Sequence, residues 1–200
     1  MTRAAVTALA TQVRGALVIV CAMAFLVMSG CTPESRNHLP DKDRIAPDAR
    51  LIGHWHGNVE GADYVADVTR SDPLTLHLAL TETLPIGKQP ITKTGYLINL
   101  YVVGSRTVLA IRDIEPKPGN WRFAVVVFGG DDRVSLMFMD GKFVRNEVYR
   151  AALGGVIQTD DPTFPDVLLT ASPDDLSTFI RNTDEARLFN VPFGTFEREP

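Results

Sequence analysis

Apolar and polar residues alternate along several segments of the chain, with the period expected for β-strands. In the clearest case, leucine stands at every second position from Leu74 to Leu80, and the residues between are less apolar. Two further segments, Tyr96–Val103 and Arg106–Ile114, flank Gly104-Ser105. A two-residue connection of this kind is typical of a tight β-hairpin.

The same pattern continues beyond residue 114. Trp121–Phe128 and Arg133–Met139 flank a glycine- and aspartate-rich loop, and Asp140-Gly141 predicts a turn into a strand over Lys142–Arg150. Two earlier strands are expected at Gly53–Val59 and Tyr64–Arg70. Because successive strands are joined by short connections, the chain is predicted to form an antiparallel meander.

Some of these strands are apolar on both faces. Ala124–Phe128 and Leu136–Met139 contain almost no polar side chain, which a sheet with one wet face does not require. The sequence leaves two explanations open. Either another element covers the outer face of the sheet, or the inner face borders an apolar cavity.

One helix is predicted near the C-terminus. Ser172 is suited to cap it, Pro173 to its first turn and Asp175 to a capping box, and Leu176, Phe179 and Ile180 follow at helical spacing. A last strand is expected over residues 194–198. The predicted fold is mainly β: an antiparallel β-barrel, or a strongly curved sheet, of about eight strands with one C-terminal α-helix.

The first 30 residues are typical of an export signal. Arg3 and Arg14 precede an apolar run from Ala16 to Met28 that small residues terminate. The run is about 13 residues long, whereas a membrane-spanning helix needs roughly 20. The length favours a cleaved signal over a permanent span, and the basic residues are expected to stay in the cytoplasm.

The end of this run, Met28-Ser29-Gly30-Cys31, resembles the lipobox of bacterial lipoproteins, although Met28 replaces the leucine usual there. The resemblance implies that Cys31 is lipidated and becomes the first mature residue. An ordinary cleaved signal and an uncleaved span with an incidental cysteine are the alternatives. The protein is expected in the cell envelope, and, if the organism has two membranes, on the outer membrane facing the periplasm. Several acyl chains on one residue would make a stable anchor.

Three regions follow from this interpretation: a signal peptide over residues 1–30, a lipidated cysteine with a flexible tether over 31–50, and a single barrel-like domain over 51–200. The tether is predicted because residues 32–50 contain three prolines, many charges and few apolar groups.

Charge and cysteine content narrow the range of functions. The chain has 20 basic and 24 acidic residues; because Arg3 and Arg14 leave with the signal, the mature net charge is −6. This balance gives no electrostatic basis for binding nucleic acid. With Cys21 removed and Cys31 lipidated, the folded domain has no cysteine, which excludes disulfides, thiolate metal sites and cysteine nucleophiles.

Gly53-His54-Trp55 is the most distinctive stretch of the domain, and it resembles the Gly-x-Trp motif that opens the first strand of lipocalins. In that family the tryptophan packs across the closed end of the barrel against an arginine from a late strand. The resemblance implies these roles for Trp55 and Arg198. The alternative is a core tryptophan on a first strand.

Candidate chemistry is sparse. His54 and His56 share one face of a strand, a spacing that can serve a metal, but a third ligand would have to come from elsewhere, so no metal site is predicted. The chain has no Gly-x-Ser-x-Gly, Ser-x-x-Lys or His-Glu-x-x-His motif and no phosphate-binding glycine loop. We therefore expect no enzyme activity and no cofactor.

Two hypotheses for the function remain open. In the first, the barrel binds a small apolar ligand. That hypothesis predicts an internal cavity lined by Trp55, Val125, Val127, Leu136 and Phe138. In the second, the domain is an interaction module of an envelope assembly, with a filled core and an exposed apolar patch.

Overall fold

The computed structural model describes residues 32–59, 61–83, 90–114, 118–159 and 166–199. The predicted signal peptide and Cys31 lie outside these residues. Among the described residues, no helix has the length and hydropathy needed to cross a membrane.

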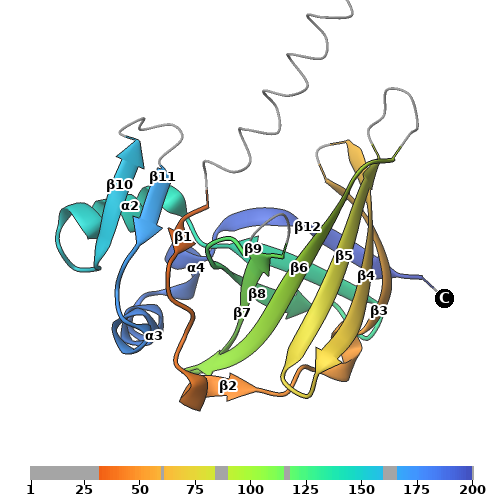
Figure 1. The fold of residues 1–200 in the computed structure, drawn as a ribbon, viewed down its shortest axis with the longest axis horizontal. Coiled ribbons are helices and arrows are strands. Elements are labelled where there is room, and N and C mark those ends of the chain that lie inside the picture. Colours follow the sequence, from red (N-terminus) through yellow and green to blue (C-terminus); the bar gives the residue numbers. More distant parts are fainter. Residues whose placement is uncertain (1–31, 60, 84–89, 115–117, 160–165, 200) are drawn as a thin grey trace, which may run out of the picture.

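Eight antiparallel strands form a closed barrel (Figure 1). They are β3 (Gly53–Val59), β4 (Ala62–Asp72), β5 (Thr75–Thr83), β6 (Pro90–Val103), β7 (Arg106–Asp113), β8 (Arg122–Phe128), β9 (Arg133–Phe138) and β12 (Val191–Arg198). The order around the barrel is β6-β5-β4-β3-β12-β9-β8-β7, and the pairing of β7 with β6 closes it. The predicted fold class is therefore confirmed.

A smaller α/β layer lies against one side of the barrel, and most of it is inserted between β9 and β12 (Figure 1). It contains α2 (Gly141–Tyr149), β10 (Gly155–Thr159), β11 (Asp166–Leu169), α3 (Pro173–Asn182) and α4 (Glu185–Leu188). From the N-terminal segment, β1 (Glu34–Ser35) joins β11 in parallel. We call these elements the covering layer.

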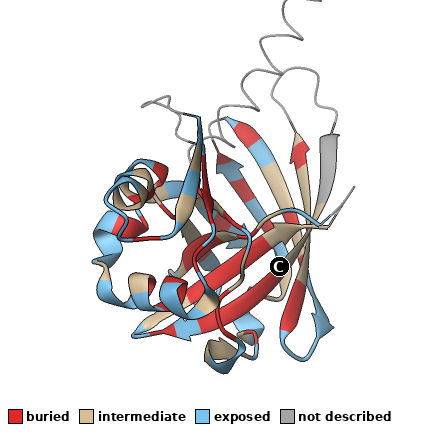
Figure 2. Cartoon of the chain, turned by 60° about the vertical axis from the view of Figure 1, so that its left-hand side comes forward, coloured by how far each residue is buried: buried red, intermediate tan, exposed pale blue. Residues whose placement is uncertain are grey.

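Two hydrophobic cores result, one inside the barrel and one between the barrel and the covering layer. Trp55 and Phe196 belong to the interior core, whereas Phe123, Leu176 and Ile180 belong to the second. Figure 2 shows buried residues both along the barrel strands and within the covering layer. Strands β7 and β8 contribute to both cores, which explains why their sequences are apolar on both faces.

The segment predicted as a flexible tether is instead packed on the domain. After β1 it forms η1 (Asp41–Asp43), β2 (Arg44–Ile45), which pairs with β6, and η2 (Ala49–Leu51). Leu39 is 0% exposed. The tether prediction is wrong for residues 32–50, because backbone pairing and a few buried side chains hold a segment that has little apolar surface of its own.

The strand predicted over Lys142–Arg150 is also wrong, because these residues form α2. The Asp140 carboxylate accepts hydrogen bonds from the backbone N–H groups of Lys142 and Phe143, so it caps a helix. The predicted C-terminal helix is confirmed as α3, with Ser172 as its N-cap. It packs on the outside of the barrel and does not plug an end. The predicted last strand is confirmed as part of β12.

The two ends of the barrel differ in what lies near them. The Gly104 end holds the β6–β7 turn, the β8–β9 turn and the start of β3. The Val59 end holds the β3–β4 turn and the start of β8. Because Ser35 forms a bridge with Trp121, just before β8, the described chain begins near the Val59 end.

Candidate functional site

Trp55 and Arg198 meet at the Gly104 end. The Arg198 guanidinium carbon lies 4.5 Å from the centre of the Trp55 ring, and Trp55 is 2% exposed. The indole Nε1 donates to the carbonyl of Leu51 at 2.9 Å. The partner that the resemblance implied for Trp55 is therefore present.

Arg198 also joins the last strand to the segment that enters the first. Its Nη1 donates to the carbonyl of Ile52 at 2.7 Å, and its Nη2 donates to the carbonyl of Arg50. Gly53 leaves room for this contact: a Cβ at that position would lie 2.6 Å from Nη1 of Arg198, and the φ of Gly53 is +140°. These contacts explain why glycine precedes the tryptophan by two residues.

The barrel interior contains a cavity of about 80 Å³. Its wall is made of apolar side chains: Leu51, Trp55, Ala66, Val68, Leu76, Leu78, Leu80, Ile98, Leu109, Ile111, Val134, Leu136, Phe193 and Phe196. Small-molecule sites usually measure about 300–1,000 Å³. The interior is thus largely filled by its own side chains.

The structure separates the five residues predicted to line a cavity. Trp55 and Leu136 line the interior cavity, and Phe138 lies in the interior core, edge-on to Phe193 at 5.6 Å. The prediction is wrong for Val125 and Val127, which lie on the outer face of β8. Val125 packs against the covering layer and lines a separate pocket beside Arg106, and Val127 is 51% exposed.

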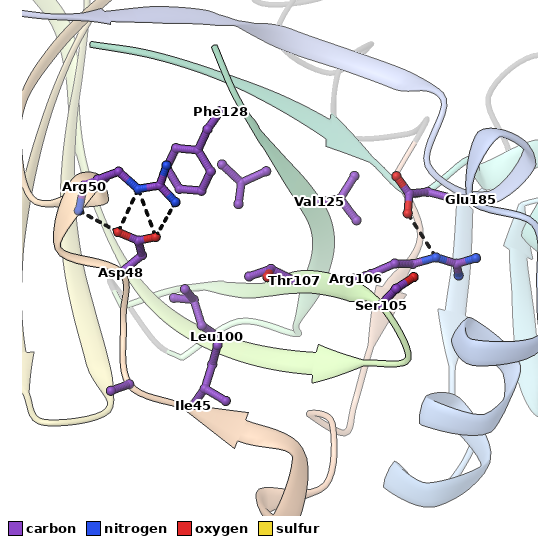
Figure 3. A pocket seen from close by; sticks show the side chains of 12 residues that line it. Ile45, Asp48, Arg50, Leu100, Ser105, Arg106, Thr107, Val125, Phe128 and Glu185 are labelled. Atoms are coloured by element: carbon purple, nitrogen blue, oxygen red, sulfur yellow. Dashed lines mark hydrogen bonds and ion pairs between the residues drawn. The ribbon is translucent and has the colours of Figure 1, made fainter. Parts of the chain in front are cut away.

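A larger pocket of about 490 Å³ lies at the Gly104 end, and we call it the end pocket (Figure 3). Its lining combines an apolar floor with polar groups: Ile45, Ala46, Asp48, Arg50, Leu100, Ser105, Arg106, Thr107, Val125, Val126, Phe128 and Glu185. Polar groups that converge on a concave site are typical of ligand binding, and the exposed lining of this pocket is more polar than apolar.

An ion pair between Asp48 and Arg50 forms one side of the end pocket. Their closest atoms are 2.7 Å apart, and the Arg50 guanidinium carbon lies 3.9 Å from the centre of the Phe128 ring. Hydrogen bonds from the side chain and backbone of Arg50 lower the pKa of Asp48. Because Asp48 also caps η2, this side of the pocket is fixed by the segment leading into β3.

A second ion pair, between Arg106 and Glu185, forms the opposite side (Figure 3). The Arg106 Nε lies 3.0 Å from a carboxylate oxygen of Glu185. Arg106 also donates to the carbonyl of Ile180 and, at 2.6 Å, to that of Thr183, near the end of α3. It therefore ties the β6–β7 hairpin to the covering layer.

The end pocket lies where β7 and β8 part. The two strands form four consecutive pairs, and the last joins Val108 to Val125. Beyond that pair, β8 continues in register with β9 alone. The barrel is therefore closed by a short ladder that does not extend to the Gly104 end.

The two histidines predicted to share a strand face are on the outer surface. His54 and His56 are both exposed, and Nδ1 of His54 lies 2.5 Å from a carboxylate oxygen of Asp67. Within the described part of the chain, no group of three or more histidine, cysteine, aspartate or glutamate side chains is arranged to hold a metal ion. The absence of enzyme activity stays a prediction.

Sequence reasoning missed the charged residues of the end pocket. Asp48 and Arg50 were assigned to the tether, and Arg106 and Glu185 belong to a hairpin and a helix far apart in the sequence. The available signal was local: an aspartate two residues before an arginine, at the start of a turn, favours a capped 3₁₀ helix.

The protein-family models, the curated proteins and the solved structures contain no match to this chain. The lipoprotein and lipocalin resemblances therefore rest on the residues quoted for them.

Proposed function

We propose that the protein is a lipid-anchored component of a bacterial cell envelope that binds a ligand in the end pocket and has no enzyme activity. The observation that carries the proposal is the end pocket itself. Its volume of about 490 Å³ falls within the usual range for a ligand site, and it lies where β7 and β8 leave backbone groups without a ladder partner among the described residues.

The lipid anchor is supported by the lipobox-like sequence that ends at Cys31. Glu34–Ser35 lies near the start of β8, and Phe128, at the far side of the pocket, ends that strand about 20 Å away. A lipid on Cys31 would hold the Val59 end toward the bilayer. The end pocket would then open away from it, so we expect the ligand to arrive from the aqueous compartment.

The ligand is expected to have an apolar part. Val126 and Phe128 are partly exposed apolar residues in the lining of the pocket, while each arginine beside them is already paired with a carboxylate. A small apolar ligand is the first candidate. A protein partner is the second, because Val102 and Val127, on strands that border the pocket, are 42% and 51% exposed.

Native mass spectrometry of residues 32–200 tests the ligand site, by comparison with the denatured mass. We expect an excess mass of a few hundred daltons, on the order of that of a small ligand. Thr107→Trp, which fills the pocket, should abolish this excess, whereas Thr69→Trp on the exposed face of β4 should retain it. A bound mass that survives Thr107→Trp would place the ligand elsewhere.

The anchor is tested separately by Cys31→Ser in the producing cell. We expect loss of lipid labelling and a soluble or unprocessed product. Unchanged membrane attachment without any lipid mass would contradict the lipoprotein proposal and favour a retained span.

A further inference from the structure

The open part of the β7–β8 junction exposes backbone as well as side chains. If the register of the four existing pairs continued, Thr107 would lie opposite Val126, and Ser105 opposite Phe128. Neither pair forms, and all four residues line the end pocket. The pocket therefore lies between two strand ends that would be neighbours in a fully paired barrel.

The register with β9 shows which backbone groups of β8 point toward this opening. In an antiparallel strand, alternate residues direct their N–H and C=O groups to opposite neighbours. The N–H of Gly129 donates to the carbonyl of Arg133, so the odd-numbered residues of β8 pair with β9. Val126 and Phe128 thus direct their backbone groups toward β7, and they have no ladder partner there among the described residues.

Strand β7 also directs backbone groups toward the opening. The two-residue turn makes Val103 and Arg106 the closing pair of the β6–β7 hairpin, so Thr107 directs its backbone groups away from β6. Three residues on two strands therefore present N–H and C=O groups to one pocket. On β8, these groups repeat at the two-residue spacing of a strand, about 6.7 Å.

We propose that the ligand of the end pocket is an extended peptide segment of a partner protein, which adds along the free edge of β8. This inference rests on the proposed function and names the class of its ligand. An added peptide strand would carry backbone N–H and C=O groups at the same two-residue spacing as those of Val126 and Phe128. Because the acids and arginines that border the pocket neutralise one another, the segment that fits is uncharged. Its apolar side chains would lie on Val126 and Phe128.

The test uses the full chain in detergent and two pools of capped hexapeptides with randomised uncharged side chains. The second pool is N-methylated at every residue, which removes the backbone donors on both edges of each peptide. Binding is followed by backbone amide hydrogen exchange. We expect the first pool to slow exchange at Val126 and Phe128 at least tenfold, and the methylated pool to leave it unchanged.

A pair of variants at one position removes the donor of β8. Val126→Pro deletes an N–H that the β9 ladder does not use, whereas Val126→Ala shortens the side chain and keeps that N–H. We expect at least tenfold weaker peptide binding for Val126→Pro and less than threefold for Val126→Ala.

If both peptide pools bound equally, or if neither bound, the ligand would not be an extended peptide. This comparison uses the native chain, so it holds even if Val126→Pro does not fold. The proposed function would still stand if native mass spectrometry found a small molecule that Thr107→Trp displaces. Peptide binding that Thr107→Trp left unchanged would overturn the end-pocket site itself.

Discussion

Strands β3 and β8 belong to the same barrel, but the outer face of β3 is exposed to solvent and that of β8 is largely covered. Along β3, Trp55 and Val59 are buried inside, while His54, His56 and Asn58 are exposed on the outside. Strand β8 is buried on both faces from Phe123 to Val125, because the covering layer lies on its outer side.

This difference shows what an apolar pattern reveals about a strand. Alternation on β3 identifies the inner face, because water contacts the other face. On β8 both faces are apolar, so the pattern indicates only that both are covered. Of the two explanations that the sequence leaves open for double-sided strands, a covering element from the same chain applies to β8.

The largest expected effect tests this contrast between strands. Phe123→Ala removes a fully buried ring from the second core and should lower the free energy of unfolding by about 3–5 kcal/mol. His56→Ala, on the exposed face of β3, should change it by no more than about 0.5 kcal/mol. Urea unfolding of residues 32–200 measures both. Similar losses would mean that the covering layer adds little to stability.

The next effect concerns the contact between Trp55 and Arg198 at the Gly104 end of the barrel. Arg198→Ala removes the contact with the buried Trp55 ring and the donors to the partly buried Ile52 carbonyl and the exposed Arg50 carbonyl, so we expect a loss of about 2 kcal/mol. Arg133→Ala is the control, because its ion pair with Glu197 is exposed and worth about 0–1 kcal/mol. The same urea titration measures both. Equal losses would contradict a special role for Arg198.

Local chemistry made parts of the fold predictable. Ser172 and the residues after it contain their own capping signal and apolar stripe, so α3 could be recognised without knowledge of its neighbours. The hairpin turns at Gly104-Ser105 and between β8 and β9 were likewise predicted from the residues of the turns themselves. The contact between Trp55 and Arg198 joins distant residues, and it was predicted only because three residues resemble a known motif.

The remaining features depend on tertiary structure. Val125 and Val127 were placed on the wrong face because only the register with β7 and β9 decides which face of β8 is inside. Residues 32–50 looked unable to fold, since their stability comes from pairing with β6 and β11. The end pocket depends on where β7 and β8 part, which no local pattern encodes.

A smaller effect distinguishes the helix at residues 141–149 from the strand expected there. Asp140→Ala removes the side chain that accepts from Lys142 and Phe143 and should cost about 1 kcal/mol. Asp140→Ser retains an acceptor and should cost only a few tenths of a kcal/mol. Thermal unfolding monitored by circular dichroism measures both variants. Equal losses would mean that Asp140 does not act as a cap.

The smallest effect is a pH dependence at the end pocket. Hydrogen bonds from Arg50 lower the pKa of Asp48 in the folded protein, so the unfolded chain binds this proton more tightly. The stability that Asp48 contributes is therefore fully present above its unfolded pKa of about 4 and is lost as the pH falls through the lower folded value. We expect the stability difference between the native chain and Asp48→Asn to shrink below about pH 4.

Asp72→Asn serves as the control for this acid effect. Its pKa is also lowered, chiefly by the backbone N–H of Leu74, but Asp72 does not line the end pocket. The stability difference from the native chain should therefore shrink below about pH 4 for both variants, and only Asp48→Asn should free Arg50 from its carboxylate. Because Arg50 lies over Phe128, that release should alter ligand binding at neutral pH. If both variants bound the ligand like the native chain, the ion pair between Asp48 and Arg50 would stabilise η2 without affecting ligand binding.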